Sequence, residues 1–415
     1  MAEAMKDSGI EWCKEIPTSW ETKPNKYIMS KRKDICSHYS GEVILSLTMQ
    51  GVIVRDLDAG GKMPTSFDGY QKVYPGNLLM CLFDYDVTPR CIGLISNKGL
   101  TSPAYSQFVL KDNNCARYYY YYYLMIDNTK ELLHLAKNLR HSFTEEQIGI
   151  IKVPVPPVAE QEKIADFLDE KCAEIDKLSE DIQKQIDILN NYKKSVITRA
   201  VTKGLNLGVE MKDSGDERLD MIPANWDAKK LKFVTREIYE NGLMVPENDK
   251  YIGMENVLSY SNDFHETNTE YEISFQKKCK KGVVLFGKLR PYLAKVIICP
   301  FTGFATGEFM QLSNFDGDLR YLRYSLLNRT FIEFVNMSTY GAKMPRANAE
   351  YINNLKIRIP PKDEQCKIAD FLDNVCQKID ESIRLQQKQL SHLDTYKRSI
   401  IYEYVTGKKR VKGAL

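Results

Sequence analysis

The stretch from Pro156 to Asp169, PPVAEQEKIADFLD, returns from Pro360 to Asp373 as PPKDEQCKIADFLD. The segment Met5–Gly9, MKDSG, likewise returns as Met211–Gly215, and each copy precedes an Ile-Pro pair and a tryptophan. Two matches in the same order identify the 415-residue chain as an internal duplication. Between the matching ends the two halves share almost no sequence. A shared frame predicts one architectural role, and two different inserts predict two different specificities.

The second element of the frame is a long helix. No Pro or Gly occurs from Val158 to Lys203 or from Lys362 to Thr406, and the Pro-Pro pairs before them force an extended entry. About 40 helical residues make a rod of about 60 Å. Apolar residues recur every seven positions, which is typical of a coiled coil. The residues expected in its seam are Leu168, Ile175, Leu178, Ile182 and Leu189 in the first helix and Leu372, Ile379, Leu393 and Ile400 in the second.

The inserts indicate an α/β (α+β) fold, because strand-like runs such as Asn77–Phe83 and Gly282–Phe286 alternate with turns and helical segments. Two globular domains therefore alternate with two long helices that pack as an antiparallel coiled coil. Such packing returns the chain to its start and predicts a dumbbell with pseudo-two-fold symmetry. The expected domains are 1–156 and 205–359, the expected helices are 157–204 and 360–407, and a basic tail follows at 408–415.

Composition limits the class of protein. The chain has 58 Lys+Arg against 55 Asp+Glu, so its net charge of +3 does not by itself indicate a nucleic-acid binder. Ten cysteines without a Cys-x-x-Cys pair or a close Cys/His cluster argue against a zinc site and suit a reducing cytosol. No stretch resembles a signal peptide or a membrane span, so we expect a cytoplasmic protein.

Motifs for catalysis are absent from the sequence. There is no Gly-x-x-x-x-Gly-Lys-Ser/Thr loop for ATP, no Asn/Asp-Pro-Pro-Tyr/Phe motif for adenine methylation and no Gly-x-Gly-x-x-Gly turn for a nucleotide cofactor. Five scattered histidines offer no acid-base constellation. We therefore expect no catalytic residue, no metal and no cofactor in this chain.

The second insert contains a strip suited to a phosphate backbone. From Ile273 to Gly307 there is no acidic residue and there are seven cations. Within this strip a proline-fixed turn presents Lys288, Arg290 and Tyr292, and a rigid arginine suits base reading. A second loop offers Lys343 and Arg346. A basic loop beside a strand, without any ligand, accounts for the same residues.

The first insert is less basic. Its candidates for DNA binding are Arg90, Lys98, Thr101, Ser102, Tyr105, Arg140 and His141. Six consecutive tyrosines, Tyr118–Tyr123, could stack on bases. The alternative, which we favour, is that they are buried or face a partner, since a regular structure cannot point all six one way.

The doubled pattern resembles the specificity (S) subunit of type I restriction-modification systems across essentially the whole chain. The repeated EQ-x-KIADFLD helix, GKLRPYL at Gly287–Leu293 and SPAY at Ser102–Tyr105 carry the resemblance. It implies two target recognition domains, each reading one half of a bipartite, asymmetric site in double-stranded DNA. It also implies that the helices space the two halves and dock methyltransferase (M) subunits.

The resemblance assigns the chemistry to partners. S-adenosylmethionine would be bound by the M subunits, ATP and Mg²⁺ would belong to partner subunits including the motor-nuclease (R) subunits, and the complex would reside in a bacterial or archaeal cytoplasm. Two alternatives stay open: a coiled-coil scaffold without DNA readout, and a self-contained DNA-modifying enzyme with an unrecognised motif. If the family resemblance holds, the low net charge predicts that the lone chain binds DNA weakly and that partner subunits supply the remaining DNA contacts.

Overall fold

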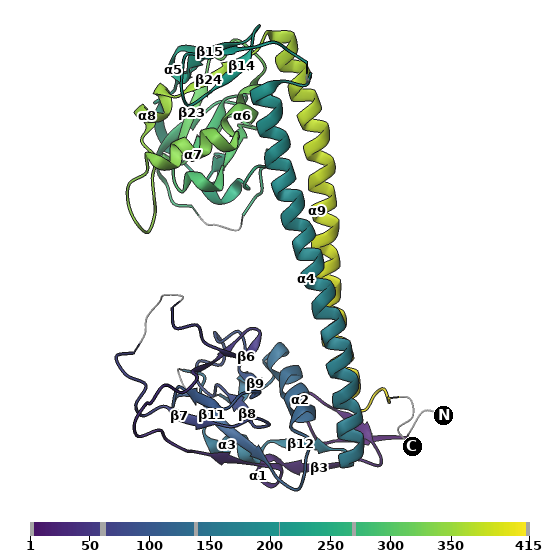
Figure 1. Cartoon of the computed structure of the whole chain (residues 1–415). Coiled ribbons are helices and arrows are strands. Elements are labelled where there is room, and N and C mark those ends of the chain that lie inside the picture. Colours follow the sequence, from purple (N-terminus) through teal and green to yellow (C-terminus); the bar gives the residue numbers. More distant parts are fainter. Residues whose placement is uncertain (1–3, 59–63, 137–139, 207, 268–270, 412–415) are drawn as a thin grey trace. The chain divides into compact units, whose positions relative to one another are not determined.

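The computed structural model describes residues 4–58, 64–136, 140–206, 208–267 and 271–411 (Figure 1). The chain divides into two compact units. Unit 1 comprises Met1–Asp181 and Lys388–Leu415, and unit 2 comprises Ile182–Gln387. Each unit therefore contains one insert, one part of the first long helix and one part of the second.

The two long helices are α4 (Val158–Lys203) and α9 (Lys362–Val405). Acidic residues occupy the first turn of each, where the helix dipole favours negative charge. Gly204, with φ of +73°, directly follows α4, and Gly407, with φ of +72°, comes two residues after α9. Glycine takes this left-handed conformation without the cost a side chain would add, which explains a sharp end to a helix.

Each unit pairs its two helical parts antiparallel. In unit 1 the rings of Phe167 and Tyr404 lie 4.3 Å apart and Lys397 Nζ is 2.6 Å from Asp176, so numbers rise along α4 as they fall along α9. In unit 2 Gln185 accepts from Gln386, and Lys193 Nζ is 2.6 Å from Asp380. These contacts confirm the predicted antiparallel pairing.

The predicted seam is largely buried. Leu168, Ile175, Ile182, Leu372, Ile379 and Ile400 are buried, whereas Leu189 and Leu393 are half-buried. Leu178 departs from the expectation, because 49% of its surface is exposed. The seam of α4 instead continues from Ile175 through Ser179 to Ile182 and Ile186, the spacing of one helical face.

Unit 1 is built on a four-stranded antiparallel sheet in the order β4 (Met29–Arg32), β11 (Ser106–Leu110), β8 (Leu78–Met80), β9 (Ile92–Leu94). Helix α2 (Ala116–Thr129) packs between this sheet and the long helices. Smaller antiparallel pairs are β1 (Met5–Asp7) with β2 (Glu15–Pro17), β3 (Glu21–Pro24) with β12 (Lys152–Val155), β5 (Leu45–Thr48) with β6 (Gly51–Val54), and β7 (Gln71–Val73) with β10 (Gly99–Thr101). Short helices are α1 (Asn25–Ile28), η1 (Leu133–Leu135) and α3 (Glu145–Ile150).

Unit 2 contains a sheet in the order β16 (Arg236–Glu237), β23 (Phe309–Ser313), β20 (Val284–Gly287), β21 (Val296–Ile298). A second sheet follows the order β17 (Asn241–Met244), β19 (Ser274–Cys279), β22 (Gly303–Ala305), β18 (Tyr251–Ile252). The pairs β13 (Met211–Asp213) with β14 (Met221–Pro223) and β15 (Asp227–Lys230) with β24 (Lys356–Ile359) belong to the frame. Its shorter helices are α5 (Leu231–Val234), η2 (Met254–Asn256), η3 (Pro291–Leu293), α6 (Leu319–Leu326), α7 (Arg329–Met337) and α8 (Ala349–Asn354).

The two inserts share one sheet although their sequences differ. The strand order β4-β11-β8-β9 of unit 1 corresponds to β16-β23-β20-β21 of unit 2. A buried glutamine marks the register in both, because Gln107 lies opposite Leu79 and Gln311 lies opposite Leu285. The inserts are therefore two versions of one domain, which the sequence comparison alone did not reveal.

The tyrosine run lies in α2 and forms core. All but Tyr120 are buried, and Tyr120 is half-buried. Tyr118 donates to the carbonyl of Val405, and its ring packs edge-on against Trp20. Burial also raises the pKa of Tyr119 and Tyr121 above the usual range. The interpretation of these residues as buried is confirmed, and their rings are not available to stack on bases.

All ten cysteines are free thiols. Within the described ranges no three His, Cys, Asp or Glu side chains come together as metal ligands. No helix among those residues is long and apolar enough to cross a membrane.

Candidate nucleic-acid interface

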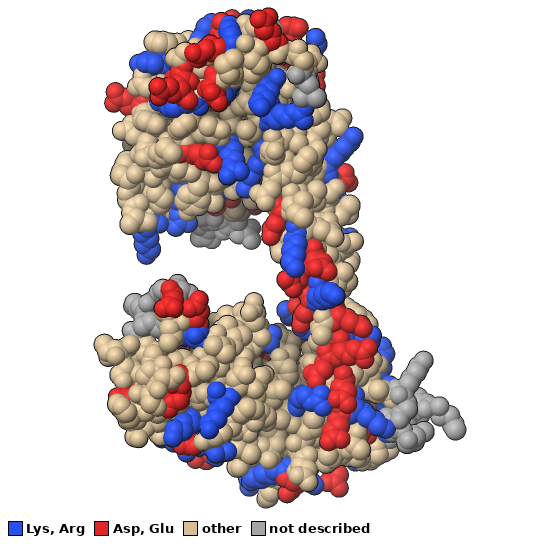
Figure 2. All heavy atoms as spheres, viewed as in Figure 1, with Lys and Arg blue, Asp and Glu red and all other residues tan. Residues whose placement is uncertain are grey.

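In unit 2 the structure joins the two basic loops that the sequence singled out. The loop after β20 runs from Lys288 to Ala294, and the loop before α8 runs from Tyr340 to Arg346. Arg290 N donates to Pro345 O at 2.7 Å, and Ala347 N donates to Lys288 O at 2.9 Å. We call these two segments the two-loop surface of unit 2. Figure 1 shows the loop between α7 and α8 projecting from the body of this unit, and Figure 2 shows blue side chains at its tip.

Arg290 occupies a special backbone position on this surface. Its φ is +48°, uncommon for a residue with a side chain, and Pro291 fixes the next residue at the start of η3. The side chain is half-buried, and its Nε has no hydrogen-bond partner among the described residues. A buried donor left unpaired costs about 1–3 kcal/mol, so this nitrogen requires a water or a ligand as acceptor.

Other cations lie on the two-loop surface of unit 2. Burial and the neighbouring charge of Lys277 lower the pKa of Lys288. Arg346 forms an ion pair with Glu308, and Lys343 is exposed. Because Lys288 is half-buried beside other positive charges, a phosphate placed there would favour its charged form.

The remaining cations of the acid-free strip are dispersed. Lys278 pairs with Glu240 at 3.1 Å, and Lys295 donates to Met254 O at 2.5 Å. Lys280 and Lys281 lie in the turn between β19 and β20, at the opposite end of β20 from Lys288. The strip is therefore continuous in sequence but does not form one continuous surface.

Tyr292 lies on a different side of the same loop. It lines an open groove of about 1310 Å³ within unit 2, whose walls include the α4 and α9 parts of that unit and the segment 258–263. Half of the Tyr292 surface is exposed. The second loop of this surface has its own exposed apolar residues, Tyr340 where its backbone pairs with Arg346 and Met344 farther along.

Unit 1 contains an equivalent pair of loops. The loop Leu82–Arg90 follows β8, and Asp84 N donates to Arg140 O at 2.9 Å while Phe143 N donates to Leu82 O at 2.8 Å. They correspond to the two backbone bonds that join the loops of unit 2, except that the second loop of unit 1 has one more residue between its acceptor and its donor. Asp84 also has a φ of +47°, like Arg290. We call the segments Leu82–Arg90 and Arg140–Phe143 the two-loop surface of unit 1.

The side chains at equivalent places differ in chemistry. Unit 1 has Leu82 and Asp84 where unit 2 has Lys288 and Arg290, and its second loop has His141 and Ser142 where unit 2 has the single Arg346. His141 Nδ1 lies 3.0 Å from Asp86, within the same surface. Clustered positive charge in the sequence therefore indicates the surface of unit 2 but does not point to Leu82 and Asp84 in unit 1.

A signal for this equivalence exists in the sequence. The run GNLLM at Gly76–Met80 matches GVVLF at Gly282–Phe286 in its opening glycine and apolar pattern. Both glycines have positive φ, +81° and +84°, as they enter the strand. Aligning the two glycines places Asp84 on Arg290.

The other residues predicted in the first insert are placed as follows. Arg90 ends the loop, but its Nη1 donates to the hydroxyl of Tyr120 on α2 at 3.3 Å. Lys98 is exposed in the turn between β9 and β10. The prediction that Thr101 binds DNA is wrong, because Thr101 is fully buried and its hydroxyl donates to Leu45 O at 2.9 Å. Its hydroxyl is therefore not available to DNA.

The Ser102–Tyr105 turn adjoins the two-loop surface of unit 1. Gln71 Nε2 donates to the carbonyls of Ser102 and Tyr105 at 3.0 and 2.7 Å, which fixes the turn. The ring of Tyr105 stacks on Phe83 at 6.2 Å. Tyr105 thereby supports the loop that carries Asp84.

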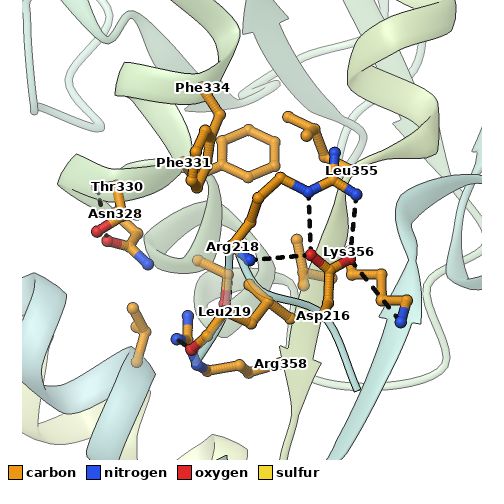
Figure 3. A pocket seen from close by; sticks show the side chains of 13 residues that line it. Asp216, Arg218, Leu219, Asn328, Thr330, Phe331, Phe334, Leu355, Lys356 and Arg358 are labelled. Atoms are coloured by element: carbon orange, nitrogen blue, oxygen red, sulfur yellow. Dashed lines mark hydrogen bonds and ion pairs between the residues drawn. The ribbon is translucent and has the colours of Figure 1, made fainter. Parts of the chain in front are cut away.

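A small pocket of unit 2 lies between the frame segments 216–219 and 355–358 and the helices α6 and α7 (Figure 3). Asp216 accepts two hydrogen bonds from the Arg218 side chain, at 2.9 and 3.1 Å, and lies 3.8 Å from Lys356. The cavity measures about 20 Å³, room for one water. Arg358 Nε and Ser325 Oγ are unpartnered within the described part of the chain and would bind such a water. The pocket is thus a polar junction and is too small for a nucleotide.

Fold and site together define a duplicated protein with two equivalent surfaces that carry different side chains. A family model for the type I restriction modification DNA specificity domain matches residues 92–188 and 220–392, more than half of the chain. The chain belongs to this family, which confirms the resemblance seen in its sequence.

Individual relatives agree with this assignment. The chain is 28% identical over 286 residues to the type I restriction enzyme MjaVIII specificity subunit of Methanocaldococcus jannaschii, covering 63% of each chain. It is 21% identical over 282 residues to the type I restriction enzyme EcoDI specificity subunit of Escherichia coli, covering 62% of each. The matches thus span less than two thirds of these relatives.

A solved structure described as the structural basis underlying complex assembly and conformational transition of the type I R-M system has the same fold. Its TM-score is 0.67 at 12% identity, and the match covers 95% of this chain and 99% of that one.

Proposed function

We propose that this chain is the DNA-reading specificity subunit of a type I restriction-modification complex. It binds double-stranded DNA at a bipartite, asymmetric site, with one half read by each unit. The observation that carries the proposal is the pair of equivalent two-loop surfaces, held by corresponding backbone bonds but equipped with different side chains. Two surfaces at equivalent places in the two units suit two half-sites. Because their side chains differ, the two half-sites would have different sequences.

The surface of unit 2 has the parts that DNA binding requires. Arginine presents a planar fork of donors that matches O6 and N7 of guanine in the major groove. Lys288, Lys343 and Arg346 supply positive charge for phosphates. Specificity and positioning thus have separate side chains within one surface.

The long helices supply docking surfaces for M subunits. Large apolar side chains lie exposed on these helices, outside the buried seam where the two helices pack against each other. In unit 1 they are Val158, Leu178 and Tyr396, and in unit 2 they are Ile188, Tyr192, Phe371 and Leu385. Exposed apolar groups on a charged helix favour a protein partner.

In this proposal the chain is non-catalytic. S-adenosylmethionine is bound by the M subunits, and the R subunits use ATP and Mg²⁺. The complex assembles in the cytoplasm of a bacterium or archaeon. An assay of the isolated chain for S-adenosylmethionine binding and DNA cleavage tests this division, and either activity would favour the self-contained enzyme.

Salt dependence separates DNA reading from a scaffold. Lys288→Ala in the assembled complex should weaken binding to all sequences and reduce the slope of log affinity against log salt by about one unit. The measurement is fluorescence anisotropy with labelled duplex across a salt series. Lys232→Ala, which removes an exposed charge on α5, is the matched control. Unchanged affinity and slope in Lys288→Ala would favour the scaffold.

A further inference from the structure

Asp84 and Arg290 occupy the same position in the two units. Each comes five residues after the leucine that pairs with the buried glutamine, Leu79 in unit 1 and Leu285 in unit 2. Each has a left-handed backbone, and each donates its backbone N–H to the second loop of its surface. The same backbone geometry therefore presents two side chains of opposite hydrogen-bonding character.

Neither side chain is fully buried, and neither has a hydrogen-bond partner within the described residues. Each is half-buried at the root of its loop. No hydrogen bond or ion pair among the described residues uses the carboxylate of Asp84, and Arg290 Nε is buried without an acceptor. A half-buried charged group without a partner is costly in a folded protein, and such groups gather at binding sites.

The neighbouring residues keep these side chains in place. In unit 1 Thr88 N donates to Asp84 O at 2.9 Å, and the stacked Phe83 and Tyr105 rings brace the loop from below. In unit 2 Pro291 and the 2.7 Å bond to Pro345 do the same for Arg290. Base reading requires this rigidity, because a flexible side chain would adapt to several bases.

We propose that Asp84 and Arg290 are equivalent specificity-determining residues, one reading a hydrogen-bond donor and the other hydrogen-bond acceptors on a base. This proposal rests on the proposed function and identifies the side chains that would read the DNA sequence. Arg290 only donates, so it selects a guanine, whose O6 and N7 accept. Asp84 only accepts when ionised, so it selects an exocyclic amino group, N4 of cytosine or N6 of adenine. Each residue determines one base pair in its own half-site.

The test uses the chain assembled with its cognate M subunit. A random-sequence duplex library is selected on the wild-type complex, and the recovered site is then measured with every single base-pair change. Arg290→Ala should reduce the preference at one position of one half-site by about 5- to 150-fold. Asp84→Asn should reduce it by a similar factor at one position of the other half-site, while the remaining positions keep their preference.

One further variant and two controls keep the test decisive. Arg290→Lys retains the charge but not the planar fork, so it should lose part of the preference for guanine while binding all sequences more tightly than Arg290→Ala. Controls are Lys232→Ala and Asp112→Asn, exposed charges at the far end of the same sheets, which should leave the site unchanged. Circular dichroism of each variant establishes that it is folded.

The outcomes are separable. A wild-type complex that selects no sequence would overturn the proposed function and this inference together. A wild-type complex that selects a bipartite site, with folded Asp84 and Arg290 variants that keep every preference, would overturn the inference alone. Equal weakening for all sequences would also overturn it, because that result marks a phosphate contact. Loss at one position in each half supports it.

Discussion

At the scale of single residues, the repeated motif is explained by the hydrogen bonds of its polar side chains. Gln161 accepts from Cys115 N at 2.8 Å and donates to Pro156 O at 2.9 Å. Gln365 repeats both bonds in unit 2, with Asp318 N at 3.1 Å and Pro360 O at 2.8 Å. The motif thus joins each insert to its long helix. The sequence showed that these residues recur, but their partners are remote in the chain and could not be read from it.

Gln365→Ala should therefore destabilise the protein. The side chain is almost fully buried, and its loss leaves Asp318 N and Pro360 O without their partner. We expect a loss of about 1–3 kcal/mol in the free energy of unfolding, measured by urea denaturation. Cys366→Ala, one residue along the same helix and exposed, should change it by less than about 0.5 kcal/mol. Equal effects of the two variants would contradict the assigned role of the glutamine.

Two ion pairs between the helices occupy equivalent places but differ in burial. The side chain of Lys193 in unit 2 is 6% exposed beside Asp380, whereas that of Lys397 in unit 1 is 23% exposed beside Asp176. Asp380→Asn should cost about 1–3 kcal/mol of stability, because it leaves a buried ammonium without its counter-charge. Asp176→Asn should cost less than about 1 kcal/mol. Urea denaturation of both variants measures the difference, and a larger loss for Asp176→Asn would refute this explanation.

At the scale of secondary structure, the local sequence pattern predicted where strands and helices form better than it predicted which strands pair with one another. The apolar runs at Asn77–Phe83 and Gly282–Phe286 become β8 and β20, because apolar segments between glycine turns form buried strands. Their place in a shared strand order depends on pairing with β11 and β23, which lie well downstream. Non-local pairing leaves no periodic signal in one sequence, so the common architecture of the inserts was missed.

The long helices lead to a prediction about docking. Ile188 is 66% exposed and Leu385 is 51% exposed, both on the helices of unit 2. The double variant Ile188→Ala, Leu385→Ala should lower affinity for the M subunit at least about tenfold, since each loses apolar contact area. Thermal stability should stay unchanged because neither side chain is in the core. Isothermal titration calorimetry measures the affinity.

The matched control for docking is Gln183→Ala, an exposed polar position on α4 in the same unit. It should retain the affinity of the wild type. Wild-type affinity in the double apolar variant would show that M subunits dock elsewhere.

At the scale of the whole molecule, duplication predicts modular specificity. The segment 235–355 contains the two-loop surface of unit 2 but neither Gln365 nor the long helices. Replacing it with the corresponding insert of another family member should change one half of the recognised sequence and leave the other half intact. Methylome sequencing of a host carrying the chimaera and its cognate M subunit measures both halves. A change in both halves would contradict modular reading.

Charge distribution also belongs to this scale. The balance of 58 basic and 55 acidic residues averages over acidic stretches on the helices and a cationic surface in unit 2. Weak DNA binding by the lone chain should therefore give way to tight binding once M subunits are present. Anisotropy with and without the M subunit, at one stated salt concentration, measures this, and tight specific binding by the lone chain would count against it.

The sequence by itself determined the duplication, the two long helices and the family, because repeats, helical periodicity and missing prolines are local properties of the chain. It also located Lys288, Arg290 and Arg346, since positive charge in an acid-free strip is visible without a fold. Only the tertiary structure joined their two loops and showed that Asp84 and Arg290 share a left-handed backbone and a hydrogen bond to the second loop. That equivalence depends on backbone hydrogen bonds between segments far apart in sequence, and such bonds preserve a position while the side chains on it change freely.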